Sequence, residues 1–293
     1  MELLDGKALA ATIKQEVKDS VPEGARPALA VVQVGEDPAS SVYIRSKVRS
    51  CEECGFDSQH VHLEEGIRQA ELLKTLRKLN DDQSVHGLLL QLPLPQHLDP
   101  DEAIRTIEPI KDVDGFHPEN LGLLVSGQPR FVPCTPLGIR ELLVRNRIDI
   151  AGKRVVVLGR SIVVGKPLAL LFALKGEGGD ATVSICHSRT KNLGEHAASA
   201  DILVAAMGKP GLVTGDMVKE GAVVVDVGIN RVPDPSKKKG YRLVGDVDFE
   251  SVAPKVSHIT PVPGGVGPMT VAMLMASTLK AYSLQVASPN AVR

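Results

Sequence analysis

Tyr43 and Lys47 are two side chains that could move a proton between them and a substrate, because a helix would place them on one face, a turn apart. A lysine amine becomes a base near neutral pH when burial lowers its pKa, so such a pair can serve proton transfer. The same spacing is also common on solvent-exposed helix faces. The pair therefore predicts acid–base chemistry only if the rest of the chain buries it.

Three other segments have side chains typical of a binding cleft. Gln91 ends an apolar stretch and precedes Leu-Pro-Leu-Pro, Asp114 precedes a glycine in the sequence KDVDGF, and a glycine-rich loop at 260–270 contains Pro263, Gly264 and Gly265. Taken singly, each has a structural alternative, namely a strand cap, a turn and the start of a helix. We expect the amide of Gln91 at the carboxyl end of a strand, where strands of α/β sheets meet a cleft.

A nucleotide site is expected where a strand at 154–158 runs into the sequence GRSIVVGKP. Glycines let the main chain approach a phosphate, and the first turn of the next helix offers unpaired N–H groups and the positive end of its dipole. The candidate contacts are Gly159, Arg160, Ser161 and Gly165. The spacing departs from Gly-x-Gly-x-x-Gly, so an ordinary strand-to-helix turn is the alternative.

The end of the following strand indicates which dinucleotide is bound. An NAD site usually has an acid there, about 20 residues on, that binds the ribose 2′-hydroxyl. In this chain the strand is followed by His187, Ser188, Arg189 and Thr190, with no acidic residue. Hydroxyls and a guanidinium suit a 2′-phosphate, which a carboxylate would repel, and Arg160 can add a second positive charge. The sequence therefore predicts NADP rather than NAD.

The elements that must position these residues alternate between strand and helix, which predicts an α/β fold with largely parallel sheets. In a first series we expect helices at 5–17, 40–54 and 68–79 and strands at 28–34, 60–63 and 86–92. In a second series we expect helices from 135, at 165–174 and at 268–284, with strands at 154–158, 182–186, 202–206 and 222–227. Asp5 and Thr135 are the expected helix N-caps. The last helix is expected to pack back on the first domain.

Composition limits the classes of protein to which the chain can belong. Of its 293 residues 43 % are hydrophobic and 24 % charged, and its net charge is −1, as in a soluble globular protein. We therefore expect binding to neither nucleic acid nor a membrane surface. We also expect no signal peptide and no membrane span. The lysine run 237–239 is expected in a solvated loop.

The four cysteines include Cys51 and Cys54, which have the spacing of a zinc or redox pair. No second pair follows, and the segment has a helical pattern that ends at Gly55, so reduced thiols in a cytoplasmic protein are the expectation. His60 and His62 alternate as on a strand and have no further partners at ligand spacing. We therefore expect no metal site.

The order of these motifs resembles one enzyme family. VGEDPASSVYIRSK, GLLLQLPLP, KDVDGFHPEN, PCTP, GRSIVVGKP, HSRT, VVDVGIN and ITPVPGGVGPMT span nearly the whole chain. Together they are similar to the bifunctional methylenetetrahydrofolate dehydrogenase/methenyltetrahydrofolate cyclohydrolase (FolD) family. The resemblance implies NADP-dependent oxidation of 5,10-methylenetetrahydrofolate and hydrolysis of the methenyl product to 10-formyltetrahydrofolate, in one-carbon metabolism and purine biosynthesis.

The resemblance also implies roles for the candidate residues. Lys47 would be the base of the hydrolysis and Gln91 would hold its amine. Tyr43 would pack on the folate ring, and Asp114 would accept two N–H bonds from the aminopyrimidine edge of the pterin. The folate would further meet main chain at Pro263, Gly264 and Gly265, and Ile229 would border the nicotinamide.

The implied architecture has two domains with a cleft between them. Residues 1–135 together with a C-terminal helix at 270–293 would form an α/β folate-binding catalytic domain, and residues 136–269 a Rossmann-like NADP-binding domain. Tetrahydrofolate derivatives would be the substrates. The family also implies a homodimer, formed through the nucleotide-binding domain.

Two other functions remain open on the sequence alone. One is a monofunctional NADP-dependent dehydrogenase, and the other is a nicotinamide-binding sensor that has lost turnover. The joint presence of Tyr43, Lys47, Gln91 and Asp114 favours the bifunctional enzyme. Short-chain dehydrogenases also use a Tyr-x-x-x-Lys pair, but theirs follows the nucleotide motif, whereas here the pair precedes it by more than a hundred residues.

Overall fold

The computed structural model describes residues 1–36, 38–237 and 240–287, and of residues 38–42 the backbone alone. The chain divides into two compact units, one formed by Met1–Ala10 with Thr135–Thr270 and the other by Ala11–Cys134 with Val271–Arg293. Each contains one parallel sheet, so we call them the six-stranded unit and the three-stranded unit. This division differs from the expected domain boundaries at the N-terminus, because β1 (Glu2–Leu3) pairs with β11 (His258–Ile259).

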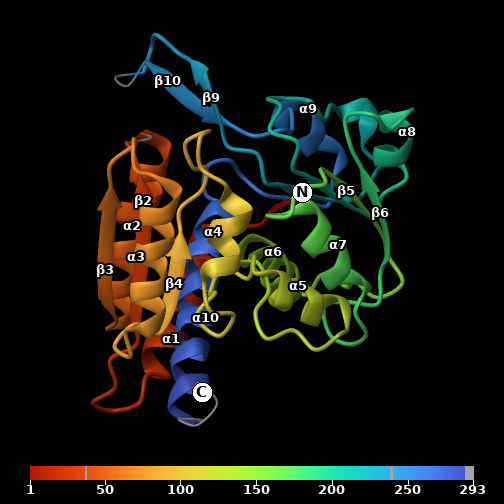
Figure 1. Ribbon diagram of the computed structural model, residues 1–293. Helices are drawn as coiled ribbons and strands as arrows, with labels where there is room; N and C mark the ends of the chain where they lie inside the picture. The colour runs from red at the N-terminus through yellow and green to blue at the C-terminus, as the bar shows by residue number, and fades with distance from the viewer. Residues whose placement is uncertain (37, 238–239, 288–293) are drawn as a thin grey trace. The chain divides into compact units, whose positions relative to one another are not determined.

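The three-stranded unit is built on the parallel strands β2 (Ala28–Val34), β3 (Asp57–Leu63) and β4 (Gly87–Leu90). Their order is β3-β2-β4, with β2 in the middle, and Figure 1 shows the helices α2 (Pro38–Cys54) and α3 (Gln69–Asp81) beside them. Because β2 is covered on both faces, it reads as an apolar run with no alternation. Its residues Ala30, Val32 and Val34 pack in one core cluster with the leucines of α3.

Local sequence sets the ends of the shorter helices. Asp99 accepts main-chain N–H bonds at the start of α4 (Pro100–Thr106), and the His117 ring caps α5 (Pro118–Val125) in the same way. Asp5 caps α1 (Gly6–Asp19) as expected, with its Oδ1 at 2.9 Å from the Ala8 main-chain nitrogen. The last helix, α10 (Val266–Ala287), is apolar around most of its circumference, which is typical of a buried helix.

The six-stranded unit contains a fully parallel sheet in the order β1-β11-β8-β7-β5-β6. Its strands β5 (Arg154–Leu158), β6 (Thr182–Cys186), β7 (Ile202–Ala205) and β8 (Val223–Asp226) lie within two residues of the expected ranges. The chain runs from β5 to β6 on one side and then returns to β7 on the other side of β5. The topological switch point, where such sheets bind ligands, therefore lies at the carboxyl ends of β5 and β7.

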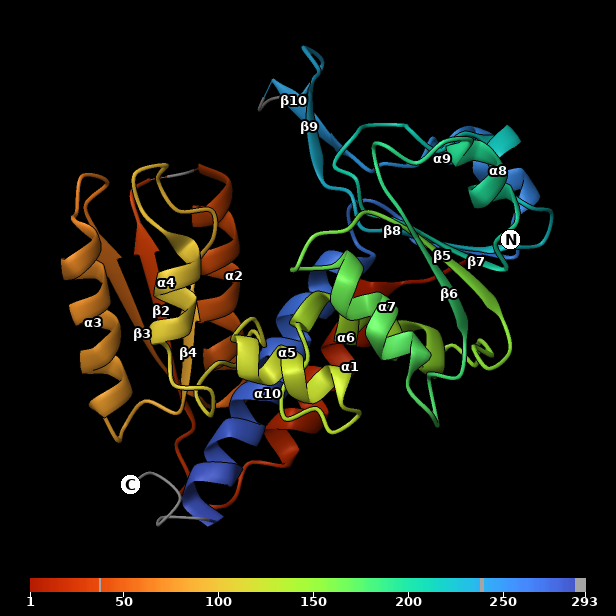
Figure 2. The same cartoon turned by 45° about the vertical axis from the view of Figure 1, so that its right-hand side comes forward.

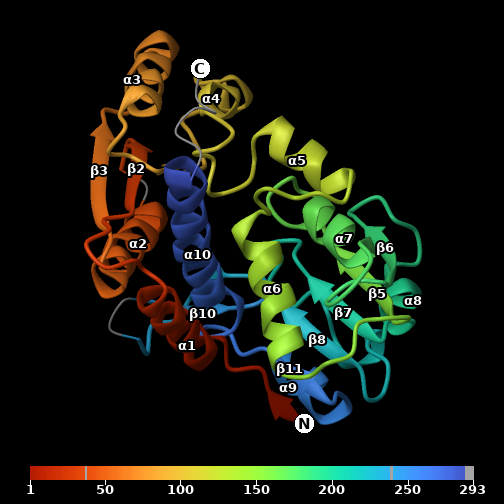
Figure 3. The ribbon, with the colours of Figure 1, turned by 90° about the horizontal axis from the view of Figure 1, so that it is seen from below.

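Helices cover both faces of this sheet, as Figures 2 and 3 show. On one face lie α6 (Cys134–Arg145) and α7 (Gly165–Ala173), and on the other α8 (Leu193–Ala198) and α9 (Phe249–Val252). A core cluster joins alternate strand residues such as Val156 and Leu203 to Ala197 of α8 and Val252 of α9. This doubly wound arrangement is the architecture that the alternating pattern predicts.

A two-stranded antiparallel hairpin, β9 (Asn230–Pro233) with β10 (Tyr241–Val244), extends from the carboxyl end of β8. The Arg231 guanidinium lies 5.0 Å from the centre of the Tyr241 ring and links the two strands. Lys237 is exposed, as expected for the lysine run, and the two lysines that follow it lie outside the described residues.

Two helix starts differ from expectation. Helix α6 begins at Cys134, so Thr135 lies within the first turn, where its hydroxyl is 2.9 Å from that of Thr270 instead of capping the helix. Helix α2 begins at Pro38, earlier than the expected Ser40, because a proline at the first turn gives up no helical hydrogen bond. In the described part of the chain no helix is long and apolar enough to cross a membrane.

Candidate active site

Lys47 lies on the buried face of α2. Ile44, Cys51 and Cys54 occupy the same stripe at helical spacing and are all buried, and Lys47 is only 8 % exposed. A lysine in a stripe of this kind has its amine out of water, which disfavours the charged form. Burial accordingly lowers the pKa of Lys47, while the nearby charges of Asp114 and Cys134 raise it. The structure thus gives this amine the environment that a neutral base requires.

Gln91 directly follows β4 and its side chain faces that of Lys47. Its Nε2 donates to the main-chain oxygen of Leu92 at 2.7 Å, which turns the amide oxygen the other way. Lys47 Nζ donates to this Oε1 at 3.0 Å. The partner of the amine is therefore a neutral oxygen, which holds the amine in place without adding the full negative charge that would keep it protonated.

The two carboxylates of KDVDGF have different surroundings. Asp112 is 2 % exposed and is used structurally, because it accepts hydrogen bonds from the main-chain nitrogens of Phe116 and His117 and from Asn120 Nδ2. Asp114 keeps part of its surface exposed and interacts electrostatically with Lys47. Desolvation raises the pKa of the Asp114 carboxyl, and the charge of Lys47 lowers it.

Gly115 lets the turn that carries Asp114 pack closely against residues 131–134. Its φ is 72°, and a Cβ at this position would lie 2.8 Å from the main chain of Val132 and Pro133. The absence of a side chain therefore lets the turn pack against the residues before Cys134. The Cys134 thiol donates to the main-chain oxygen of Val113 at 3.3 Å and interacts electrostatically with Asp114, and burial raises its pKa well above the usual value.

Cys134 and Ser277 are the members of this site that sequence reasoning missed. Ser277 of α10 is 5 % exposed and lies beside the Cys134 thiol, whose pKa it lowers. The available signal was the position of Cys134 inside PCTP, one of the quoted motifs. Ser277 carries no local signal, since it is one small polar residue in an apolar helix. Tyr43 is half-buried one helical turn before Lys47, as its spacing predicts.

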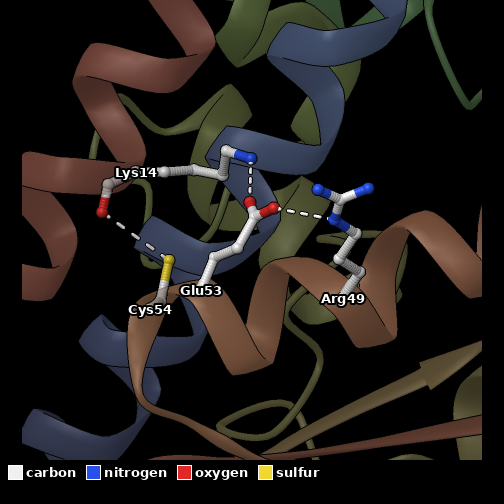
Figure 4. A network of polar contacts seen from close by, with 4 residues as sticks. All are labelled: Lys14, Arg49, Glu53 and Cys54. Carbon is white, nitrogen blue, oxygen red and sulfur yellow. Dashed lines mark hydrogen bonds and ion pairs between the residues drawn. The ribbon is translucent and has the colours of Figure 1, made fainter.

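Cys51 and Cys54 belong to the packing of α2 and not to a chemical site. Figure 4 shows the Cys54 thiol donating to the main-chain oxygen of Lys14, whose amine pairs with Glu53. Burial raises the pKa of Cys51 to about 12 and that of Cys54 to about 11, which disfavours the thiolates that zinc or redox chemistry needs. Among the described residues no group of three or more His, Cys, Asp and Glu side chains could hold a metal.

In the six-stranded unit, Gly159 follows β5 at the switch point of the sheet. Its φ is 133°, and a Cβ there would lie 2.3 Å from the main-chain oxygen of Ala206, which follows β7. A Cβ on Gly165, at the start of α7, would in turn lie 2.1 Å from the main-chain oxygen of Gly159. Both glycines are therefore required by close main-chain approach, and Arg160 and Ser161 between them are exposed.

The segment 187–190 after β6 forms a closed turn. The hydroxyl of Thr190 accepts from the main-chain nitrogen of His187 at 2.9 Å, and the His187 Nδ1 accepts from that of Arg189 at 3.2 Å. His187 and Thr190 thus build the turn, and the exposed side chains are those of Ser188 and Arg189. No acid occurs in this turn, which suits a 2′-phosphate.

Two further groups of expected residues lie in the six-stranded unit. Ile229, after β8, is 42 % exposed, and its Cδ1 would lie 3.5 Å from a Cβ on Gly267. Gly264 has a φ of 115° and its main-chain oxygen accepts from the Lys7 nitrogen at 2.8 Å. Pro263 is exposed and Gly265 is buried in the same turn. Lys47, Gln91, Asp114 and Tyr43 come together in the three-stranded unit, whereas these residues and the nucleotide-loop residues belong to the other unit.

These features define a class of protein: a two-unit α/β dehydrogenase with a doubly wound dinucleotide sheet and a buried lysine on a separate parallel sheet. Residues 4–114 match the family model of the tetrahydrofolate dehydrogenase/cyclohydrolase catalytic domain, and residues 133–286 match that of its NAD(P)-binding domain. The chain belongs to the tetrahydrofolate dehydrogenase/cyclohydrolase family.

The relatives cover almost all of the chain. It is 54 % identical to the bifunctional protein FolD of Porphyromonas gingivalis, in a match that covers 96 % of each chain. It is 52 % identical to the FolD protein of Bacteroides fragilis, in a match that covers 96 % of this chain and 98 % of that one. A FolD crystal structure from Campylobacter jejuni is similar with a TM-score of 0.91 at 50 % identity, covering 97 % of this chain and 99 % of that one.

A Trypanosoma brucei FolD complexed with NADP and an inhibitor is similar with a TM-score of 0.92 at 41 % identity, covering 97 % and 98 % of the two chains. The family, the α/β fold class, the paired dehydrogenase and cyclohydrolase activities and the NADP cofactor are thereby confirmed. The relatives favour the bifunctional enzyme over a monofunctional dehydrogenase.

Proposed function

We propose that Lys47 is the base of the hydrolytic step in a chain that oxidises 5,10-methylenetetrahydrofolate and hydrolyses the methenyl product to 10-formyltetrahydrofolate. The observation that carries this proposal is the burial of the Lys47 amine against the neutral oxygen of Gln91, at 3.0 Å. A buried amine with an amide partner is a better proton acceptor at neutral pH than an exposed one.

The two steps make different demands on the protein. In methylenetetrahydrofolate the bridging carbon lies between two nitrogens, whose lone pairs expel a hydride, so oxidation needs positioning more than a base. The bound NADP accepts this hydride. In the second step water adds to the methenyl carbon, and Lys47 takes the proton that the water loses as the new C–O bond forms. Opening of one C–N bond then leaves the formyl group on the other nitrogen.

Asp114 and Tyr43 would orient the folate in this scheme. The Asp114 carboxyl is desolvated, and such an acceptor suits the two N–H groups of an aminopyrimidine edge. Tyr43 lies one turn from Lys47 on α2, where its ring could pack on the pterin. The proposed approach of folate to Pro263, Gly264 and Gly265 rests on the family likeness, since the glycines are also required by the turn itself.

The loop from Gly159 to Gly165 and the first turn of α7 would bind the pyrophosphate of NADP, since the two glycines let the loop fold tightly against the start of the helix and Arg160 and Ser161 between them are exposed. Ser188 and Arg189 would bind the 2′-phosphate, with Arg160 as a second cation, and His187 and Thr190 would shape the turn that presents them. Ile229 would border the nicotinamide. Comparable kcat/KM values with NAD and NADP would contradict this assignment.

We also propose a domain assignment, an oligomeric state and a location. The three-stranded unit would be the folate-binding catalytic domain, and the six-stranded unit the NADP-binding domain.

A homodimer through the six-stranded unit is supported by edge strand β6, which exposes 41 % of Ile185 and leaves one side unpaired in the sheet order. Four buried, unpaired cysteines are consistent with a reducing compartment, which supports the cytoplasm.

Lys47→Met tests the central proposal. Methionine keeps the apolar stem and removes the amine, so hydrolysis of methenyltetrahydrofolate should fall by about a hundredfold or more while folate still binds. Lys74→Met, an exposed lysine on α3, is the matched control and should leave both activities unchanged. Absorbance assays of the two steps measure the result, and hydrolysis unaltered in Lys47→Met would remove Lys47 from this role.

A further inference from the structure

Two buried acids meet at the carboxyl end of β8, and one of them, Asp226, lies in the motif VVDVGIN. Asp226 ends β8 and is 4 % exposed, and Asp246 follows β10 and is fully buried. Asp226 Oδ1 accepts from the main-chain nitrogens of Gly228 and Asp246 at 2.9 Å each, and its Oδ2 accepts from that of Val247 at 3.0 Å. Asp226 therefore ties the segment after β8 to the end of the hairpin.

Asp246 reaches two other segments. Its Oδ2 accepts from the main-chain nitrogens of Met207 and Gly208 at 2.6 and 2.7 Å, and its Oδ1 accepts from Asn230 Nδ2 at 2.9 Å. Met207 and Gly208 follow β7, and Asn230 begins β9. Each carboxylate oxygen thus has a separate task, one on the loop after β7 and one on the segment after β8.

Two glycines beside the acids, Gly228 and Gly245, leave no room for a side chain. A Cβ on Gly228 would lie 2.3 Å from Asp246 Oδ1, and a Cβ on Gly245 would lie 1.7 Å from Asp226 Oδ2. Both glycines have to lack a side chain if the carboxylates are to stay where they are. This close packing restricts the positions that the two carboxylates can take, as a positioning group requires.

The residues that Asp246 binds are next to residues that support the nucleotide loop. Ala206 precedes Met207, and its main-chain oxygen occupies the space in which Gly159 would carry a Cβ. On the other side, Asn230 immediately follows Ile229. One buried carboxylate thereby connects the support of Gly159, at the phosphate end of the site, with the residue expected at the nicotinamide end.

We propose that Asp246, assisted by Asp226, is a positioning residue for NADP: its carboxylate sets the distance between the loop behind Gly159 and the segment that carries Ile229. The inference rests on the proposed NADP-linked oxidation and adds to it a pair of residues that do not touch the cofactor. The hydrolytic step consumes no NADP. Loss of the Asp246 contacts should therefore impair oxidation and leave hydrolysis at Lys47 intact.

An exchange of the two partners tests this directly. Asn230→Asp places a second carboxylate against Asp246 in place of a donor, which breaks the link and adds repulsion. We expect the KM for NADP to rise about tenfold or more, with hydrolysis and its folate KM within about twofold of wild type. Adding Asp246→Asn to this variant restores a donor and an acceptor in reversed positions, and should return the KM for NADP to within about threefold.

The controls separate positioning from mere folding and from the proposed function. Asn146→Asp, on the exposed surface of the same unit, should change none of these constants. If Asn230→Asp fails to fold, Asp246→Asn alone takes its place, and it should raise the KM for NADP because one acceptor oxygen is lost. The proposal is overturned by an unchanged KM for NADP, by equal loss of both activities, or by a double variant no better than Asn230→Asp. A wild-type protein without dehydrogenase activity would instead overturn the proposed function.

Discussion

The amide oxygen of Gln91 lies 3.0 Å from Lys47 Nζ, across 44 positions of sequence. The contact joins a helix residue to the carboxyl end of the strand β4, so the parallel sheet itself brings the two together. Because Gln91 uses its N–H on Leu92, the amide presents an acceptor and no donor to the amine. A neutral acceptor at this place is what allows burial to dominate the pKa of Lys47.

Gln91→Glu should convert this contact into an ion pair. The added charge would raise the pKa of Lys47 and so favour the protonated amine at neutral pH. Hydrolysis should fall by about tenfold or more at pH 7 and recover as the pH rises. The control is Gln128→Glu, which makes the same change at an exposed site. A pH–rate profile identical to that of wild type would contradict the role assigned to Gln91.

Asp114→Asn should move the pH dependence in the opposite direction. The charge of Asp114 raises the pKa of Lys47, so its removal lowers that pKa further and shifts the rising limb of hydrolysis to lower pH. The folate KM should increase, because one oxygen acceptor becomes a donor. Asp112→Asn is the matched comparison, since its three hydrogen bonds are internal. Asp112→Asn should lower the free energy of unfolding by about 1–3 kcal/mol and leave the pH dependence of hydrolysis unchanged.

The cysteines should be unreactive in the folded protein. All four are buried, and burial raises the pKa of each thiol, so little thiolate is present at pH 8. A thiol-specific disulfide reagent should therefore label none of them within minutes in buffer and all four after unfolding in guanidinium. Rapid labelling of Cys134 in the native protein would contradict its burial.

The free energy of unfolding between pH 4 and 6 should depend on the protonation of Asp226. Burial raises its pKa from 3.8 to about 6, so the folded state binds a proton that the unfolded state has already released between these values. The contribution of Asp226 to the free energy of unfolding therefore falls as pH rises from 4 to 6 and is constant above, by about 3 kcal/mol in all. Urea unfolding of wild type and Asp226→Asn across this range measures it. Parallel curves for the two proteins would disprove the shift.

Much of the fold follows from local patterns. The strands β2, β5 and β6 have the bounds that their apolar residues predict, and Asp5 caps α1 as its position before the helix indicates. The helix starts at Pro38 and Cys134 were harder to predict, since any residue with a free N–H or a proline can occupy the first turn. The pairing of β1 with β11 has no local signal, because two residues carry too little pattern to define a strand.

The candidate site was predictable in part for the same reason. Lys47 could be singled out by its spacing from Tyr43 and by the family resemblance, and the nucleotide turn because its glycines follow a strand, whereas the burial of Lys47 is seen only in the structure. His187 and Thr190 were expected as cofactor contacts, yet each is engaged in the turn 187–190. Polar side chains near a ligand can equally serve the backbone, and only coordinates separate the two uses.

The sequence by itself determined the alternation of strands and helices, the glycines of the nucleotide turn and the absence of an acid after β6, because these depend on spacing along a few residues. Tertiary structure alone decided that Asp112 is held by Asn120, that Cys134 and Ser277 lie with Asp114 and Lys47, and that Asp246 holds Asn230. The physical reason is that a buried polar group is defined by its partner, and these partners come from distant parts of the chain.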